Sequence, residues 1–218
     1  VQFLASLERV QAILPSARMH PYRVTPKHCV VNITAFEYRD CDIGPYNEVS
    51  IAVPIVLDRP APLFTGVLRP PPAVPMLYIK HLPVTTEVAR DAGVDFAGYP
   101  KFIADIIFRK DDRWVRSELR ENGQHILTLS GRNGSLHSAP RMRTHPITVR
   151  KGFMLRCELI ISERQQVMGR GSRGIRLELG DHPISHELRD LNLGKVLSYQ
   201  YMPRHQAILT PVCESFAV

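Results

Sequence analysis

The chain has 218 residues, of which 44% are hydrophobic and 22% are charged. This composition suits one domain with a substantial core and excludes a globally disordered protein. The formal net charge is +7, but basic residues are interleaved with acidic ones, as in Arg109-Lys110-Asp111-Asp112-Arg113. Because no recognition helix or aromatic RNA-binding motif accompanies them, we expect no nucleic-acid partner. The positive charge is better suited to steering a small anionic substrate.

We expect no membrane partner, because the sequence has neither a secretory signal pattern nor an apolar run long enough to span a bilayer. The four cysteines are far apart and include no C-x-x-C pair, so buried or free thiols in a reducing cytoplasm are predicted. They are Cys29, Cys41, Cys157 and Cys213. The sequence starts at Val1 without an initiator Met. We therefore expect residues 1–218 to be a single domain that lacks some N-terminal residues.

The first predicted element is an amphipathic helix over Phe3–Leu14, which Pro15 ends. His28–Tyr38 alternates apolar and polar residues, as a half-buried strand does. A turn over Asp40–Gly44 then leads to a second strand, Tyr46–Leu57. A strand–turn–strand order of this kind predicts an antiparallel pair.

The segment Arg59–Pro75 is rich in proline and is predicted to be an extended surface arm. An SH3-type ligand is possible, but an arm that wraps a neighbouring subunit is the simpler interpretation, and it favours a homo-oligomer. Met76–Leu82 is the next predicted strand. A short helix should follow, capped by Thr85 or Thr86 and ended by Gly93.

The second half of the chain is dominated by predicted strands with few helices. A two-residue Asn122-Gly123 turn predicts a hairpin there. The elements expected are a meander of 102–108, 114–120 and 124–129, further strands over 153–166 and 175–179, a short helix over 185–191, and a long strand or hairpin over 196–209. With no internal repeat and no linker, the pattern predicts an α+β domain dominated by antiparallel β structure.

Lys101 is the most informative residue, because it follows a glycine and a proline and has apolar neighbours, in Ala97-Gly98-Tyr99-Pro100-Lys101-Phe102-Ile103. The stretch Phe102–Phe108 reads as a largely buried strand. Burial makes an ammonium group costly, so the position favours a neutral amine. Neutral lysine amines attack carbonyl carbons and form Schiff bases. The alternative is that Lys101 snorkels, with its stem buried and its charge in water.

Three motifs in matching order resemble the acetoacetate decarboxylase family. Gly98-Tyr99-Pro100-Lys101 resembles the family's Schiff-base lysine motif. Gly44-Pro45-Tyr46-Asn47-Glu48, followed by Ile51-Ala52-Val53-Pro54-Ile55, resembles its Tyr-x-Glu segment and the strand after it. The stretch 174–183 resembles its C-terminal strand and turn. Acetoacetate decarboxylase is itself a standard example of an activated catalytic lysine.

The resemblance implies a closed or cone-like β-barrel with a few short helices and with Lys101 in its interior. It implies a carbon–carbon lyase that acts on a small keto acid through an iminium, without a cofactor or a metal. Two other functions stay open. The same lysine could carry out aldol or dehydration chemistry on a keto acid, or the barrel could bind a small carbonyl or apolar ligand without catalysis.

Glu48 is the second predicted catalytic residue, because it matches the family's glutamate. The two-residue period of a strand places it opposite Val49, Ile51 and Val53, on a face that could line the interior. A carboxylate there could orient a substrate or move a proton. An exposed strand glutamate is the plain alternative. Tyr46 is predicted to bind substrate.

Tyr99, Phe102 and Asn32 are further predicted substrate-binding residues, and two of them mark departures from the family. Phe102 stands where the family's decarboxylases resemble one another in having a second lysine. Asn32 is the nearest polar residue in the strand where they carry a second glutamate. The family's pocket arginine would precede the first helix. We therefore expect weak or no turnover of acetoacetate, with burial or another cation, such as Arg90, activating Lys101.

Two further motifs fit other functions poorly. Gly169–Gly174 matches G-x-G-x-x-G, but Ile175–Leu179 alternates like a strand, whereas a dinucleotide site needs a helix there. His182 and His186 are four residues apart, but a third metal ligand is not visible. We expect neither a dinucleotide nor a metal.

Overall fold

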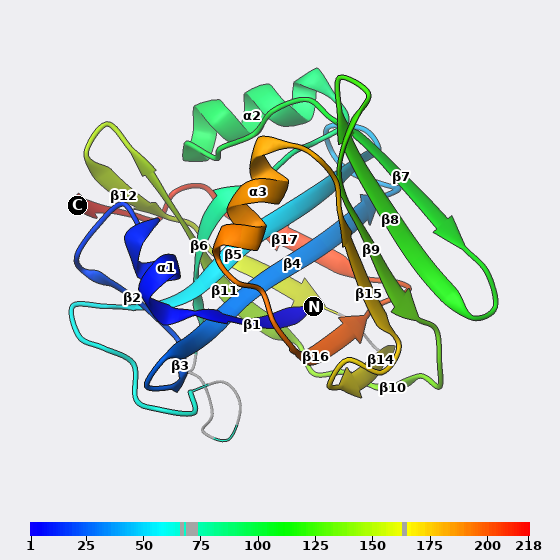
Figure 1. Ribbon diagram of the computed structural model, residues 1–218. Coiled ribbons are helices and arrows are strands. Elements are labelled where there is room, and N and C mark those ends of the chain that lie inside the picture. The colour runs from blue at the N-terminus through cyan, green and yellow to red at the C-terminus, as the bar shows by residue number, and fades with distance from the viewer. Residues whose placement is uncertain (66–67, 69–73, 163–164) are drawn as a thin grey trace.

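The computed structural model describes residues 1–65, 68, 74–162 and 165–218. Within these residues three short helices pack around β-sheets (Figure 1). The helices are α1 (Leu7–Ala12), α2 (Glu87–Ala97) and α3 (Pro183–Asp190). None of the described helices has the length and apolar character needed to cross a membrane.

The strands fall into a large sheet and a small one. The large sheet comprises β1 (Gln2–Ser6), β2 (Met19–Pro21), β3 (Arg23–Thr25), β4 (His28–Tyr38), β5 (Tyr46–Leu57), β6 (Met76–His81), β10 (His137–Ser138), β11 (Met142–Arg150), β12 (Phe153–Arg156), β13 (Leu159–Ser162), β14 (Gln165–Arg170), β16 (Val196–Tyr201), β17 (Gln206–Leu209) and β18 (Glu214–Ala217). The small sheet comprises β7 (Asp105–Lys110), β8 (Trp114–Glu121), β9 (Gln124–Arg132) and β15 (Ile175–Leu179).

The order of the large sheet is β10-β14-β16-β1-β4-β5-β6-β11-β12-β18, with β13 and β17 branching from β11. Its pairs are antiparallel except β6 with β11. The prediction of a mostly antiparallel α+β domain is therefore confirmed. The prediction of a closed barrel is wrong, because over the described residues no sheet closes on itself. Closure needs the end strands to pair, and the end strand β10 has only two residues.

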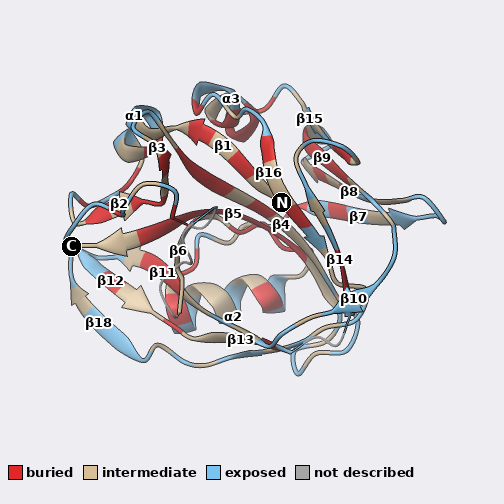
Figure 2. Cartoon of the chain, turned by 90° about the horizontal axis from the view of Figure 1, so that it is seen from below, coloured by how far each residue is buried: buried red, intermediate tan, exposed pale blue. Residues whose placement is uncertain are grey.

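The β4–β5 hairpin divides the interior into two regions. Val49, Ile51 and Val53 pack in the main core. Ala52, from the opposite face of β5, packs in a second apolar cluster with residues that include Ala97 and Tyr99. Figure 2 shows the buried run along both strands. Glu48 lies on the same face of β5 as Ala52, so the strand alternation keeps it out of the main core.

Several predicted elements have different bounds in the structure. Phe3–Leu14 divides into β1 and α1, because residues 2–6 pair between β4 and β16 and alternate in burial. Gly93 lies inside α2, which continues to Ala97 and is capped by Gly98. β11 was not predicted at all. Most of the proline-rich segment, including Arg69-Pro70-Pro71-Pro72, lies outside the described residues.

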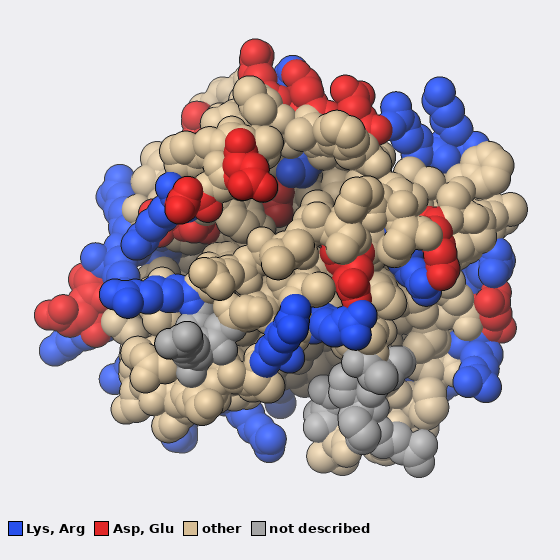
Figure 3. Space-filling view, turned by 180° about the vertical axis from the view of Figure 1, so that it is seen from behind, with Lys and Arg blue, Asp and Glu red and all other residues tan. Residues whose placement is uncertain are grey.

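Other predictions hold closely. β4, β5 and β15 have the predicted bounds. The β8–β9 hairpin turns at Asn122 and Gly123, both with positive φ, as its sequence predicts. The four cysteines are free. On the face that Figure 3 shows, basic and acidic side chains are both present, with several acidic ones grouped at the top of the view.

Buried Cys29 predicts a loss of stability at alkaline pH. Burial raises the pKa of its thiol from 9.0 to about 12. The unfolded thiol thus ionises first, so its contribution is complete below pH 9 and is lost as the pH rises to about 12. We expect the free energy of unfolding to fall by about 1.4 kcal/mol per pH unit from this group. Urea unfolding at pH 8.5–10.5 should show a shallower fall in Cys29→Ala, and equal slopes would contradict the assignment.

Candidate active site

The local sequence places Lys101 just beyond the end of α2. Thr86 caps the start of the helix by accepting a hydrogen bond from the Ala89 amide, at 3.3 Å. Gly98 ends it with a left-handed φ of 61°, which glycine adopts without strain. The Tyr99 amide then donates to the Gly93 carbonyl at 3.2 Å. This cap turns the chain back across the sheet, and Lys101 follows the turn.

The segment that carries Lys101 is held by backbone hydrogen bonds to residues 82–84, which lie between it and β5. The Leu82 amide donates to the Pro100 carbonyl at 3.2 Å, and the Val84 amide donates to the Phe102 carbonyl at 2.9 Å. Val84 in turn forms a β-bridge with Glu48. The backbones of Lys101 and Glu48 therefore lie on either side of the segment that contains Val84, which fixes them relative to each other.

Lys101 and Glu48 form a buried ion pair. The lysine Nζ lies 2.9 Å from the glutamate Oε2, and their side chains are only 7% and 9% exposed. Lys101 therefore does not snorkel into solvent, and Glu48 is not an exposed strand glutamate. The structure brings together the two residues predicted to be catalytic.

Burial and ion pairing shift the pKa of Glu48 in opposite directions. Burial raises the pKa of the Glu48 carboxyl, and the neighbouring lysine lowers it by a smaller amount. A raised pKa makes this carboxyl a better proton acceptor than an exposed glutamate would be.

Two tyrosine rings flank the Lys101 nitrogen. Nζ lies 5.4 Å from the ring centre of Tyr46 and 6.0 Å from that of Tyr99. Burial raises the pKa of both phenols, with the Glu48 carboxylate adding to the effect. Both rings therefore stay neutral and present electron-rich faces that stabilise a positive nitrogen. The Tyr99 hydroxyl also donates to the Cys157 thiol.

Gly93 leaves the space in which the Lys101 stem lies. A Cβ built on Gly93 would lie 2.5 Å from the lysine Cε and 2.6 Å from its Cδ. These distances are shorter than carbon atoms can approach without displacement. A glycine inside α2 costs helix stability, and here it lets the lysine pass directly over the helix backbone. Gly93 was predicted to end the helix, but it lies inside α2 and makes room for the Lys101 side chain.

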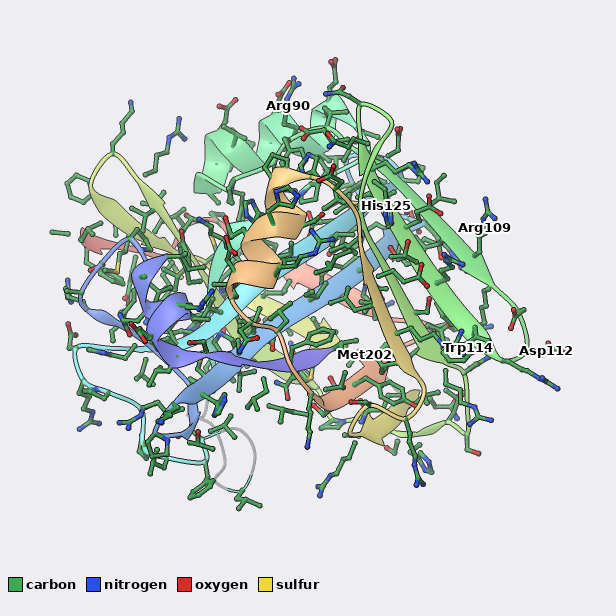
Figure 4. All side chains as sticks on the ribbon, in the orientation of Figure 1. Arg90, Arg109, Asp112, Trp114, His125 and Met202 are labelled. Carbon is green, nitrogen blue, oxygen red and sulfur yellow. The ribbon has the colours of Figure 1, made fainter. Side chains whose placement is uncertain are left out.

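Three other candidates lie away from the pair. Phe102 is partly buried against the main core. Asn32 lies in β4 opposite Ala52, four residue pairs along the hairpin from Glu48, and its buried Oδ1 lacks a hydrogen-bond partner among the described residues. Arg90 lies on the outer side of α2 (Figure 4) and pairs with Asp91 at 2.7 Å. Arg90 therefore does not supply the cation expected near Lys101.

Sequence reasoning missed two residues next to the site. Tyr38 pairs with Tyr46 across the hairpin, with 4.7 Å between ring centres. Tyr38 has an even number in β4, which places its side chain on the same face as Tyr46 and Glu48. This signal could be used only once the register of β4 against β5 was known. Cys157 offers no such signal, because it comes near Tyr99 only through the tertiary fold.

The rejected motifs have structural roles. Gly169–Gly174 spans the end of β14 and the turn before β15, so a helix does not follow it. His182 caps α3 and lies 2.9 Å from the Glu121 carboxylate. Over the described ranges, no group of three His, Cys, Asp or Glu side chains is placed to hold a metal ion. A surface cavity of about 680 Å³ lies elsewhere, beside α1 and β3.

Comparison with known proteins identifies one family. The sequence model of the acetoacetate decarboxylase family matches residues 1–210. A search of curated protein sequences gives no match.

Solved structures have the same fold at low sequence identity. One, described as acetoacetate decarboxylase, has a TM-score of 0.66 at 15% identity, with 100% of this chain and 85% of that chain covered. The enduracididine biosynthesis enzyme MppR, complexed with the condensation product of pyruvate and imidazole 4-carboxaldehyde, has a TM-score of 0.63 at 10% identity, covering 99% and 85%. An acetoacetate decarboxylase-like enzyme from Sphingomonas wittichii RW1 has a TM-score of 0.53 at 16% identity, covering 97% and 88%.

Proposed function

Because this chain belongs to the acetoacetate decarboxylase family, we propose that it is a lyase that forms a Schiff base between Lys101 and a small keto acid. The observation that carries the proposal is the buried Lys101–Glu48 pair, with 2.9 Å between nitrogen and oxygen. A lysine nucleophile needs a base within hydrogen-bond reach to remove its proton, and Glu48 is at that distance.

Glu48 can accept and return the protons that the first steps require. It takes a proton from the Lys101 ammonium, and the free amine attacks the substrate carbonyl carbon. The same proton then returns to the carbonyl oxygen and gives a hydroxyl. Glu48 next moves a second proton from the nitrogen to this hydroxyl, which leaves as water as the C=N bond forms. The pair begins as ammonium and carboxylate and ends as iminium and carboxylate. Its net charge is unchanged, so a buried site gains no uncompensated charge.

The iminium nitrogen then accepts the electrons of a neighbouring bond. If that bond joins a carboxylate to the carbon next to the iminium carbon, CO₂ leaves and an enamine forms. The rings of Tyr46 and Tyr99, about 5–6 Å from the nitrogen, stabilise the positive iminium more than the neutral enamine. They therefore favour imine formation over its collapse.

Aldol condensation or dehydration of a keto acid is the second candidate reaction. Phe102 stands in place of the second lysine, and the strand around Asn32 lacks an acidic residue. MppR, which shares the fold, has also been solved with pyruvate bound. These features support carbonyl capture without requiring acetoacetate as the substrate. A non-catalytic ligand-binding protein is the third candidate.

The test is covalent trapping by borohydride in the presence of pyruvate. We expect a mass increase on a peptide that contains Lys101, because hydride reduces the iminium to a stable secondary amine. Lys101→Arg keeps the positive charge but cannot form the imine, so it should show no added mass. Labelling at a different lysine would refute the assignment, and absence of any label would favour the ligand-binding candidate.

Product analysis separates the two enzymatic candidates. Release of CO₂ from a β-keto acid identifies decarboxylation. Formation of a longer carbon chain from pyruvate and an aldehyde identifies condensation. Rapid CO₂ release from acetoacetate would show that the missing lysine and glutamate are dispensable.

A further inference from the structure

Three aromatic side chains extend from the Lys101–Glu48 pair along one face of the β4–β5 hairpin. In the strand register Tyr38 lies opposite Tyr46, and Phe36 lies opposite Glu48. The rings of Phe36 and Tyr38 are nearly parallel, at 8° with 5.6 Å between centres. We call Phe36, Tyr38 and Tyr46 the aromatic wall. It begins 5.4 Å from the lysine nitrogen.

The aromatic wall is only partly enclosed. Its three residues are partly buried, as are Ala35 and Asn47 beside them on the other face of the strands. A surface hollow of about 370 Å³ lies beside Tyr38 and Tyr46, with Thr85 on its rim. Tyr46 therefore borders both this hollow and the lysine nitrogen.

The wall has the geometry of a stacking surface. His205, from the segment between β16 and β17, presents its ring at 60° to Phe36 and 67° to Tyr38, with centres 6.0 and 5.8 Å away. Phe36 and Tyr38 thus already make parallel and edge contacts with other rings. Aromatic rings prefer such offset and edge-on arrangements. A flat group on the substrate could make the same contacts along the wall.

We propose that the aromatic wall makes this site selective for keto acids that carry a flat aromatic or conjugated side chain. The inference rests on the proposed Schiff-base function and adds the substrate class. The carbonyl carbon would lie at Lys101 Nζ, and the flat side chain would lie along Tyr46 and Tyr38. Charge development at the nitrogen would be the same for every keto acid, so the selectivity comes from the side chain alone.

The experiment compares three 2-oxo acids in borohydride trapping: phenylpyruvate, cyclohexylpyruvate and pyruvate. The first two have side chains of similar size and apolar character, but only the phenyl ring is flat and can stack. We expect phenylpyruvate to be trapped about two- to tenfold faster than cyclohexylpyruvate, the range that stacking supplies beyond apolar burial. Pyruvate reports the Schiff-base step without a side chain.

Substitutions locate the source of the preference. In Tyr38→Leu and Phe36→Leu the phenyl-to-cyclohexyl ratio should fall towards one. Trp114→Leu is the matched control, because Trp114 lies at the lower end of β8 in Figure 4, away from α2. It should keep the wild-type ratio. A ratio unchanged in both wall variants would overturn the inference.

The outcomes separate this inference from the function on which it rests. Trapping of pyruvate, with equal rates for the two larger acids or with both rejected, would overturn the substrate class and leave the Schiff-base proposal intact. Failure to trap any of the three acids would overturn both.

Discussion

Replacing Gly93 by alanine is expected to slow covalent trapping at Lys101 by about 100-fold, the loss that a displacement of about 1 Å can cause. The added Cβ would meet the lysine Cε and Cδ at 2.5 and 2.6 Å. The lysine stem must then move, and its nitrogen leaves the Glu48 oxygen. The measurement is the trapping rate with pyruvate, followed by mass spectrometry of the Lys101 peptide.

Helix propensity and crowding predict opposite effects of Gly93→Ala on the stability of the fold. Alanine is favoured over glycine inside a helix by roughly 1 kcal/mol, so an uncrowded site would become more stable and stay reactive. Asp95→Ala is the matched control, because Asp95 is an exposed position of α2 at which alanine also favours the helix. It should trap at the wild-type rate. Wild-type trapping in Gly93→Ala would show that the lysine does not depend on this gap.

The Lys101–Glu48 pair is expected to contribute to chemistry and to cost stability. Glu48→Leu leaves the lysine without its partner in a buried site, and breaking such a pair typically costs about 3–5 kcal/mol. The double variant Glu48→Leu/Lys101→Met removes both buried charges. It should recover most of that loss in urea unfolding at pH 7, while trapping stays absent. A double variant no more stable than the single one would contradict this account.

The single variant Lys101→Met should be sensitive to pH in a defined direction. Without the lysine, burial alone acts on Glu48 and raises its pKa further above the ordinary 4.5. The folded protein then holds a proton that the unfolded chain releases. The stability of the variant should therefore be greatest below about pH 4.5 relative to wild type and fall as the pH rises through the raised pKa. Unfolding midpoints for both proteins between pH 4 and 8 measure this difference.

The regular strands of the fold could be predicted from the sequence because their signals are local. The bounds of β4 and β5 follow from alternation alone, and Asn122-Gly123 determines its hairpin turn. β1 was mistaken for helix, since Leu4 and Leu7 also satisfy helical spacing and only pairing with β4 and β16 makes 2–6 a strand. Whether the large sheet closes depends on pairing between distant strands, which no local pattern specifies.

The site was predictable where a family motif agreed with a second local signal. Apolar flanking residues supported Lys101 and the strand period supported Glu48, and the structure places the two in contact. Phe102 was considered because it stands where the family has a second lysine, but successive residues on an extended segment point in opposite directions. Arg90 was considered as a cation, but it lies in α2 and pairs with Asp91. Gly93 was read as a helix end. Its contact with the Lys101 side chain depends on tertiary structure, because α2 must form and the chain must turn back at Gly98 before the two meet.

β5 carries two independent sets of positions along one strand. Residues 49, 51, 53 and 55 pack in the main core, whereas 46 and 48 contact the reactive nitrogen. Evolution could therefore change the second set while the first maintains folding, so new reactions need not destabilise the scaffold. A directed-evolution library that varies residues 36, 38 and 46 and preserves the odd-numbered positions would exploit this separation.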